Sequence, residues 1–260
     1  MSSTELPDGA VAFLDELAAA AKPVIERYFR TGLDVEAKSD DSPVTIADRT
    51  VEKTLRELIE ARYPDHGIAG EEFGVVRIDA EFVWSLDPID GTKAFITGRP
   101  TFGTLVGLLK EGVPVLGMVD CCMLGERWVG GPKVPTEFNQ HPVGPGRQRS
   151  LDKAVLTATS PDMFPGEEEG MFAGLRDQVG LTLYSGDCHN FGLLASGFID
   201  LVVESQLSDY DYLAPAAVVA GAGGILTDWE GNPPRLGSTH RIVAARDPKL
   251  HEAALKALNS

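Results

Sequence analysis

The stretch from Trp84 to Lys93, with the sequence WSLDPIDGTK, constrains the fold more than any other part of this 260-residue chain. Its first residues are apolar and typical of a buried strand. Pro88 predicts that the strand ends there, because proline lacks an N–H and disfavours the helical region at the residue before it. The residues from Gly91 onward predict a helix with Asp90 as its N-cap. Two carboxylates three residues apart therefore flank a helix N-terminus.

This arrangement suits metal-assisted phosphate chemistry. Carboxylates bind divalent cations, and the free N–H groups at a helix N-terminus favour an anion such as phosphate. A plainer interpretation is that Asp87 only ends a strand and Asp90 only caps a helix. The spacing alone leaves both interpretations open.

The charge of the chain limits its partners. A formal net charge of −16 argues against nucleic acid or an anionic membrane as the main partner, because both would repel the protein. A phosphorylated substrate remains compatible if cations lie between the acids and the phosphate. Three cysteines without metal-binding spacing predict a reducing, cytoplasmic environment. The N-terminus has no signal-peptide pattern, and no apolar stretch is long enough to span a membrane.

The first half of the chain predicts two amphipathic helices and a meander. Apolar residues from Val11 to Phe29 recur at helical spacing, and Pro23 is expected to bend or interrupt that helix. A polar loop at 36–43 leads to a second helix that begins near Thr45 or Ile46, which places Asp48 in its first turn. A short strand precedes Glu71 and Glu72. Segments 105–109, 113–119 and 127–129 then predict an antiparallel meander.

The second half predicts alternating strands and helices. Strands are expected at 154–158, 181–184, 198–204, 225–227 and 242–245. Helices are expected at 167–177, 186–196, 210–222 and 248–258. This alternation predicts a sheet with helices on both faces. Glycine and proline are abundant at 130–150, which predicts a seam between an N-terminal α+β half at 1–140 and a C-terminal α/β half at 141–260.

Four carboxylates lie at the ends of predicted elements: Glu71, Asp87, Asp90 and Asp211. Loops at such positions carry function on a rigid scaffold. If these groups converge, like charges would raise one another's pKa, and bound cations would remove that cost. The sequence alone does not show the convergence.

Three motifs resemble the inositol monophosphatase superfamily. Asp87-Pro88-Ile89-Asp90-Gly91-Thr92 matches its metal-binding motif, with Gly70-Glu71-Glu72 a short distance upstream. Tyr210-Asp211, before a helix that ends in Ala222-Gly223-Gly224, is similar to its second motif, with Tyr210 where tryptophan is usual. Pro43-Val44-Thr45, with Ala47-Asp48, resembles its early loop and helix. The resemblance spans nearly the whole chain and implies that family's layered α-β-α-β-α sandwich.

Within the superfamily, the chain is most similar to the histidinol-phosphate phosphatase branch. The stretches that carry this similarity are 90–96, 185–188, 193–197, 203–205 and 210–213. The usual glycine-containing hairpin of the family is hard to recognise at 130–146.

The resemblance implies two to three Mg²⁺ ions, which fit oxygen ligands better than Zn²⁺ does. It assigns one ion to Glu71, Asp87 and the carbonyl of Ile89. It assigns a second ion to Asp87, Asp90 and Asp211.

The same resemblance implies how the reaction proceeds. The phosphate would accept N–H bonds from Gly91 and Thr92, and a water activated by the metals would attack it. Thr92 and Asp48 would orient and deprotonate that water. Glu71 would also touch a weaker third ion through water.

The substrate expectation rests on charge. Histidinol phosphate carries an ammonium and an imidazole, and Asp187 and Glu204 are candidates to bind this cationic end. The alternative is that Asp187 caps a helix and Glu204 binds a hydroxyl, as expected for an inositol monophosphatase. A third possibility is a non-catalytic interaction protein on the same fold. A homodimer in the cytoplasm, acting in histidine biosynthesis, is what the resemblance implies.

Overall fold

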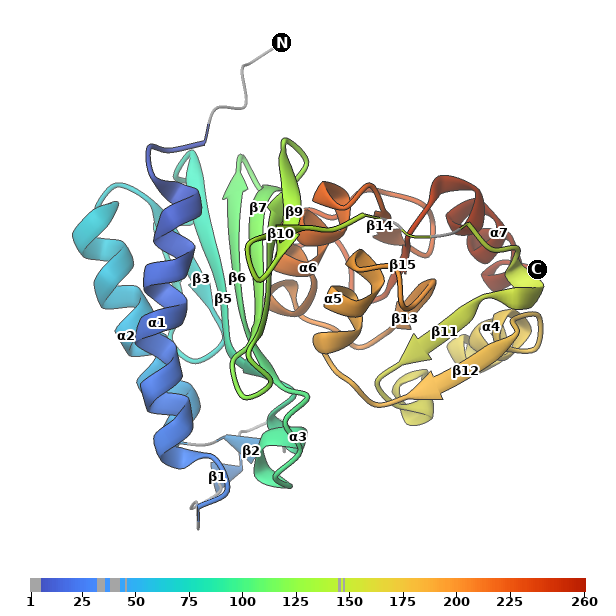
Figure 1. Ribbon diagram of the computed structural model, residues 1–260, viewed down its shortest axis with the longest axis horizontal. Helices are drawn as coiled ribbons and strands as arrows, with labels where there is room; N and C mark the ends of the chain where they lie inside the picture. The colour runs from blue at the N-terminus through green and yellow to red at the C-terminus, as the bar shows by residue number, and fades with distance from the viewer. Residues whose placement is uncertain (1–5, 32–35, 38–42, 45, 145, 147) are drawn as a thin grey trace.

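The computed structural model describes residues 6–31, 36–37, 43–44, 46–144, 146 and 148–260. Helices and sheets alternate in layers across the molecule (Figure 1). Helices α1 (Ala10–Tyr28) and α2 (Ile46–Arg62) cover the outer face of the first sheet. Helices α5 (His189–Ala195) and α6 (Asp209–Gly221) lie between the two sheets, and α4 (Glu167–Arg176) and α7 (Pro248–Leu258) cover the second sheet. The predicted α-β-α-β-α sandwich is confirmed.

The first sheet has eight strands in the order β10-β9-β8-β7-β6-β5-β3-β4. The strands are β3 (Gly67–Gly70), β4 (Gly74–Val76), β5 (Phe82–Asp90), β6 (Gly103–Lys110), β7 (Val113–Cys121), β8 (Glu126–Gly131), β9 (Val134–Phe138) and β10 (His141–Pro142). Strands β6 to β8 form the predicted antiparallel meander, and β5 pairs antiparallel with β6. The turn between β6 and β7 has Glu111 and Gly112 at positive φ, which matches the right-handed twist of the flanking strands.

The outer helices largely follow the predicted pattern. Leu14, Leu17 and Ile25 of α1 are fully buried, but Val11 is 42% exposed, and Phe13 is buried instead. Pro23 does not interrupt α1, since the helix continues to Tyr28 with Pro23 on its exposed side. In the predicted polar loop, β1 (Glu36–Ala37) pairs with β2 (Pro43–Val44). Residues 38–42 and Thr45 lie outside the described residues.

The structure corrects the interpretation of residues 130–150, which were predicted to form a seam between two halves of the chain. Strands β8 and β9 form a hairpin, with Gly131 opposite Val134, and β10 continues the sheet to Pro142. Gly130 and Gly131 are required because a Cβ at either position would collide with the adjacent backbone. The segment that was expected to be a seam is therefore partly sheet. The division of the chain at 140/141 stays a prediction.

The second sheet has five strands in the order β12-β11-β13-β15-β14. They are β11 (Val155–Ala158), β12 (Leu181–Tyr184), β13 (Leu201–Glu204), β14 (Ile225–Asp228) and β15 (Ile242–Ala245), with short 3-10 turns η1 (Leu151–Lys153) and η2 (Pro161–Met163). Strand β15 runs antiparallel to both neighbours, so the sheet is mixed. Strand β13 is shorter than predicted, and Phe198 is 71% exposed. Helices cover both faces, as predicted.

Helix α6 joins the two halves of the molecule. Its buried residues pack against β6 and β7 on one side and against β15 on the other. A Cβ at Gly117 of β7 would lie 2.2 Å from the carbonyl oxygen of Ala214, so only glycine allows the helix to approach the sheet this closely. This contact fixes the N-terminus of α6 beside the end of β5.

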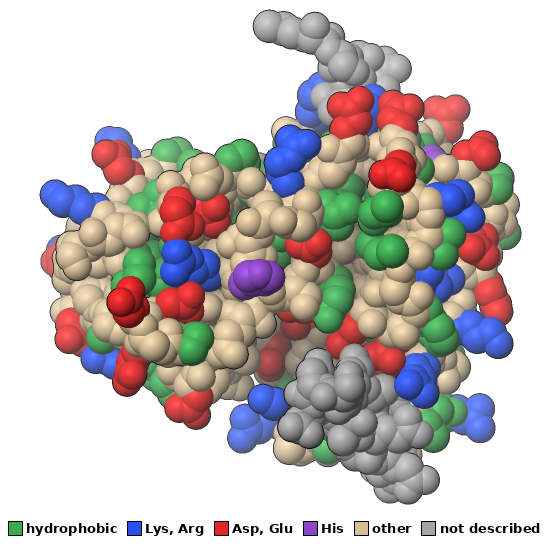
Figure 2. Space-filling model, turned by 180° about the vertical axis from the view of Figure 1, so that it is seen from behind, with side chains coloured by type: hydrophobic (Ala, Val, Ile, Leu, Met, Phe, Trp, Pro, Cys, Tyr) green, Lys and Arg blue, Asp and Glu red, His purple; other side chains and the backbone are tan. Residues whose placement is uncertain are grey.

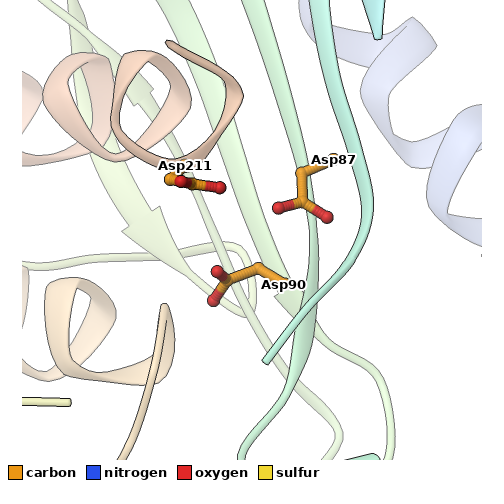
Figure 3. A group of neighbouring side chains, drawn as sticks. All are labelled: Asp87, Asp90 and Asp211. Carbon is orange, nitrogen blue, oxygen red and sulfur yellow. The ribbon is translucent and has the colours of Figure 1, made fainter. Parts of the chain in front are cut away.

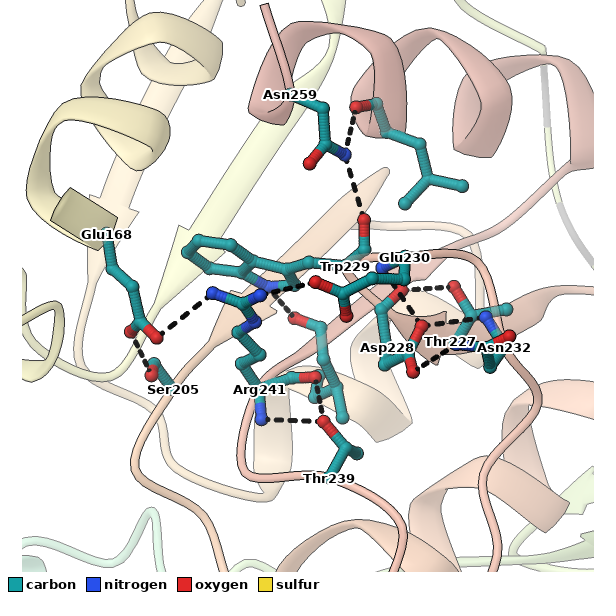
Figure 4. A network of polar contacts seen from close by, with 12 residues as sticks. Glu168, Ser205, Thr227, Asp228, Trp229, Glu230, Asn232, Thr239, Arg241 and Asn259 are labelled. Carbon is teal, nitrogen blue, oxygen red and sulfur yellow. Dashed lines mark hydrogen bonds and ion pairs between the residues drawn. The ribbon is translucent and has the colours of Figure 1, made fainter.

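A polar network supports the strand end that carries Glu204 (Figure 4). Glu168 of α4 accepts a hydrogen bond from the Ser205 hydroxyl and lies 3.3 Å from the Arg241 guanidinium. Arg241 also pairs with Glu230 and stacks over Trp229 at 5.2 Å from the ring centroid. The helices in the described part of the chain include none with the length and hydrophobicity of a transmembrane segment.

Candidate metal centre

Strand β5 brings the first two carboxylates of the site together. The strand was predicted to end at Pro88. It continues instead to Asp90, with an irregularity in its pairing between Asp87 and Asp90. Pro88 is tolerated because it falls in this irregularity, where no ladder hydrogen bond from its nitrogen is needed. The buried Thr104 hydroxyl donates to the Pro88 carbonyl at 2.8 Å and fixes the segment.

Asp90 is not the cap of the following helix. Helix α3 (Thr92–Ile96) has Gly91 as its N-cap, at φ +84°, and no side chain caps it. The Asp90 Oδ2 instead accepts a hydrogen bond from the backbone N–H of Cys188 at 2.7 Å. The plainer interpretation of Asp90 is therefore wrong, and this carboxylate faces the second half of the chain.

Asp211 reaches the same place from the N-terminus of α6. Ser208 is the N-cap, and Asp211 accepts the Ser208 backbone N–H at 2.7 Å in a capping box. The helix begins at Asp209, one residue before the predicted start at residue 210. The capping contact holds the Asp211 carboxylate in one orientation.

The three aspartates converge (Figure 3). One carboxylate oxygen from each of Asp87, Asp90 and Asp211 lies within 4.8 Å of the other two. Burial and the nearby Glu71 raise the pKa of Asp87 well above its usual value. Burial and the charge of Asp211 raise the pKa of Asp90 to about 7, and burial with the charge of Glu71 raises the pKa of Asp211 to about 7. The expected convergence is confirmed for these three aspartates.

The donor set fits a divalent cation. Asp87 Oδ1 is buried and accepts no hydrogen bond from the described residues. Anionic oxygens packed this closely repel one another unless a cation lies among them. Oxygen-only ligands favour Mg²⁺ or a similar hard cation over Zn²⁺.

The raised pKa values predict how stability depends on pH. Without metal, the folded protein holds protons on Asp90 and Asp211 up to about pH 7, whereas the unfolded chain releases them near pH 4. Their contribution to stability is therefore present at low pH and lost as the pH rises through about 7. We expect the melting temperature of the metal-free protein to fall by several degrees between about pH 5.5 and pH 8.

Differential scanning fluorimetry with and without Mg²⁺ checks this expectation. Because the cation replaces these protons, stabilisation by Mg²⁺ should increase over the same pH range. A Mg²⁺ shift that is independent of pH would contradict the predicted protonation of the cluster.

The other predicted catalytic residues lie around the cluster. Glu71 follows β3, and its charge contributes to the raised pKa of Asp87, Asp90 and Asp211. Asp48 lies buried in the first turn of α2 and also raises the pKa of Asp87. The Thr92 hydroxyl donates to the Ile89 carbonyl at 3.2 Å. The roles assigned to these residues stay predictions.

Asp187 and Glu204 extend the acidic region away from the three aspartates. A Cβ at Gly91 would lie 3.0 Å from the Asp187 side chain, so this carboxylate packs directly on the β5–α3 turn. Burial and the charge of Asp90 raise the pKa of Asp187 to about 7. Asp187 does not cap α5, whose N-cap is Cys188 without a side-chain cap.

Glu204 lies at the buried end of β13. It accepts a hydrogen bond from the Thr159 hydroxyl at 2.7 Å. Burial raises its pKa to about 8, and the charges of Asp90 and Asp187 act in the same direction. Figure 2 shows acidic side chains in the hollow where the two halves of the molecule meet.

Sequence reasoning missed a cavity beside the cluster. The cavity has a volume of about 470 Å³ and is lined by residues next to the candidate ligands, among them Gly70, Ser85 and Tyr210. Burial raises the pKa of the Tyr210 hydroxyl above its usual value. The small side chain of Ser85 was the available signal, because a larger one would fill the space. Gly70 is required for a different reason, since a Cβ there would lie 2.1 Å from Glu52 Oε1.

The comparison with known proteins decides the family. The model of the inositol monophosphatase family matches residues 8–260. The chain belongs to this family. Over 267 residues it is 43% identical to the bifunctional phosphatase IMPL2, chloroplastic, of Arabidopsis thaliana, covering 99% of this chain and 77% of that relative. Over 245 residues it is 35% identical to a histidinol-phosphatase of Mycobacterium tuberculosis, covering 90% and 91% of the two chains.

The solved structures agree with the fold. An inositol monophosphatase from Zymomonas mobilis superposes with a TM-score of 0.89 at 43% identity, covering 97% of this chain and 98% of that one. The family is one of metal-dependent phosphomonoesterases, and the acidic cluster is the corresponding feature of this chain. The named relatives differ in their substrates, so family membership does not fix the substrate.

Proposed function

We propose that this chain is a Mg²⁺-dependent phosphatase that releases phosphate from histidinol phosphate. The observation that carries the proposal is the continuous acidic region, in which Asp187 and Glu204 extend the cluster of three aspartates. The aspartates would hold the metal, and the two further acids would bind a cationic substrate group. The relative named histidinol-phosphatase supports this choice.

Each part of the proposed reaction has a residue to perform it. Glu71, Asp87, Asp90 and Asp211 would hold Mg²⁺, together with the Ile89 carbonyl. When bound, Mg²⁺ neutralises the phosphate and lowers the pKa of water. The backbone N–H groups of Gly91 and Thr92 would bind the phosphate.

Thr92 and Asp48 would position the attacking water and accept its proton. Asp90 is held by the Cys188 N–H and Asp211 by the Ser208 N–H, so neither carboxylate needs to reorient when the metal binds. This preorganisation favours catalysis because little structural rearrangement is required.

The choice of histidinol phosphate as substrate rests on two carboxylates that are removed from water. Asp187 and Glu204 are largely removed from water, and like charges raise the pKa of both. A ligand that brings an ammonium or an imidazolium would neutralise them, whereas the hydroxyls of an inositol ring would not. The second candidate is an inositol monophosphatase, which the solved Zymomonas mobilis protein of that name favours.

A substrate panel separates the candidates. Phosphate release should be measured with histidinol phosphate, inositol 1-phosphate, 3′-phosphoadenosine 5′-phosphate and fructose 1,6-bisphosphate, each with and without Mg²⁺. The proposal expects the highest kcat/KM with histidinol phosphate. Faster turnover of inositol 1-phosphate would favour the second candidate. No turnover of any ester would favour a non-catalytic interaction protein. Assembly as a homodimer stays a prediction for light scattering to test.

Asp187→Asn tests the charge argument. Hydrogen bonds to charged groups contribute roughly 1.5–3 kcal/mol, so the variant should lose about ten- to a hundredfold in kcat/KM for histidinol phosphate. Hydrolysis of a small neutral phosphate ester should change much less, because such an ester has no cationic group for Asp187 to bind. Asp162→Asn, which changes an exposed acid in the same half of the chain, is the control and should leave both activities unchanged. An equal loss with both substrates would make Asp187 a structural residue.

A further inference from the structure

A second cavity lies on the other face of the first sheet. It has a volume of about 330 Å³ and is open to solvent, and its lining includes residues of α1 and of strands β7, β8 and β9. Asp120 of β7 is on the same face as Leu116 and Met118, which pack in the core with α1. Val119 faces the opposite way, in the core that contains residues of α6. The cavity is therefore separated from the metal centre by the sheet.

Asp120 is a buried acid with one unused oxygen. Its side chain is 3% exposed, and its Oδ1 accepts a hydrogen bond from Arg127 Nε at 2.8 Å. Its Oδ2 is buried and has no hydrogen-bond partner among the described residues. Burial raises the pKa of Asp120 even though Arg127 acts in the opposite direction. A buried polar atom without a partner is costly, so a donor at Oδ2 would stabilise the site.

The charges around the cavity favour a cation. Three acids line it, Asp15, Asp120 and Glu137, against the two bases Lys22 and Arg127. Arg127 is shared between two carboxylates, because its Nη1 also donates to Asp15 Oδ1 at 2.7 Å. The lining therefore carries one negative charge in excess.

We propose that this cavity binds a small primary ammonium compound, whose N–H groups donate to Asp120 Oδ2. Val11 and Val129 line the same cavity and offer apolar surface to a short hydrocarbon body. The volume is at the lower end of the range for small-molecule sites, which fits a ligand of amino-acid size. A quaternary ammonium lacks the N–H groups that Oδ2 needs, so the site would discriminate against it.

Titration with isoamylammonium tests the proposal. The probe is added to the Mg²⁺-saturated full-length chain, and backbone amide shifts are followed by NMR. We expect saturable shifts at residues around Asp120 and Arg127. Isoamyl alcohol, which has the same hydrocarbon body without the charge, should bind at least about tenfold more weakly.

Two variants locate the binding. Asp120→Asn should weaken isoamylammonium binding at least about tenfold, whereas Asp177→Asn, an exposed acid paired with Arg176, should leave it unchanged. If Asp120→Asn does not fold, Val11→Phe provides an independent test, since the larger side chain fills the cavity from the exposed surface of α1. Binding that survives both variants would overturn the proposal.

Two other outcomes would also overturn it. Equal shifts with the ammonium and the alcohol would show that the cavity recognises only the hydrocarbon. Shifts that follow protein concentration and not the amine would show that this face is an interface between two copies. None of these measurements uses turnover, so the result is independent of the proposed phosphatase activity.

Discussion

Asp87→Asn is expected to abolish phosphatase activity, with kcat/KM reduced by several orders of magnitude. Asp87 is the central carboxylate of the cluster: it is buried, its Oδ1 accepts no hydrogen bond from the described residues, and four neighbouring acids raise its pKa. An amide keeps the shape of the side chain but removes the charge that would hold the metal. Phosphate release at saturating Mg²⁺ is the measurement.

The stability of the same variant separates a lost metal site from a misfolded chain. Removing one of several repelling charges should leave the metal-free melting temperature unchanged or higher. The stabilisation by Mg²⁺ should decrease. Asp65→Asn, at an exposed acid of the same half, should change neither activity nor stabilisation. Turnover of Asp87→Asn close to that of the parent, or turnover of the parent in chelator, would contradict the proposed mechanism.

Much of the fold follows from local sequence signals. The amphipathic helix α2 and the antiparallel meander of β6 to β8 each depend on neighbouring residues, and both are confirmed. The errors arise where contacts with residues far away in the sequence determine the local structure. Phe198 belongs to an apolar run that is typical of a strand, yet it lies outside β13 and is exposed. The hairpin of β8 and β9 was missed because its glycines are required by close backbone contacts, which composition does not show.

Three aspartates of the candidate site could be predicted from the sequence, but the contacts that orient them could not. The motifs indicated Asp87, Asp90 and Asp211, and the structure brings them together. The assignment of Asp90 as an N-cap was wrong because its partner is the Cys188 N–H, almost a hundred residues away in the chain. The contact between Asp187 and Gly91 was hidden for the same reason. Local spacing predicts which groups are reactive, whereas tertiary contacts decide which direction they face.

Thr92→Ala and Asp48→Asn are expected to lower kcat while leaving Mg²⁺ stabilisation nearly intact. Proton transfer by a positioned side chain contributes about 10²–10⁴-fold, so each variant should lose activity in that range. Thr92 begins α3 beside the cluster, and Asp48 lies buried close enough to raise the pKa of Asp87. Steady-state kinetics with the proposed substrate and thermal shifts with Mg²⁺ are the two measurements.

The double variant decides whether the two residues act together. If Thr92 and Asp48 hold one water, removing both should cost little more than the worse single variant, because residues that act as a unit are not additive. Thr92→Ser keeps the hydroxyl and should retain most of the activity. Thr97→Ala removes another hydroxyl, which donates to Lys93 O at 2.8 Å just after the same short helix, and should have little effect. Additive losses in the double variant would mean that Thr92 and Asp48 work independently, and the shared proton transfer would then be wrong.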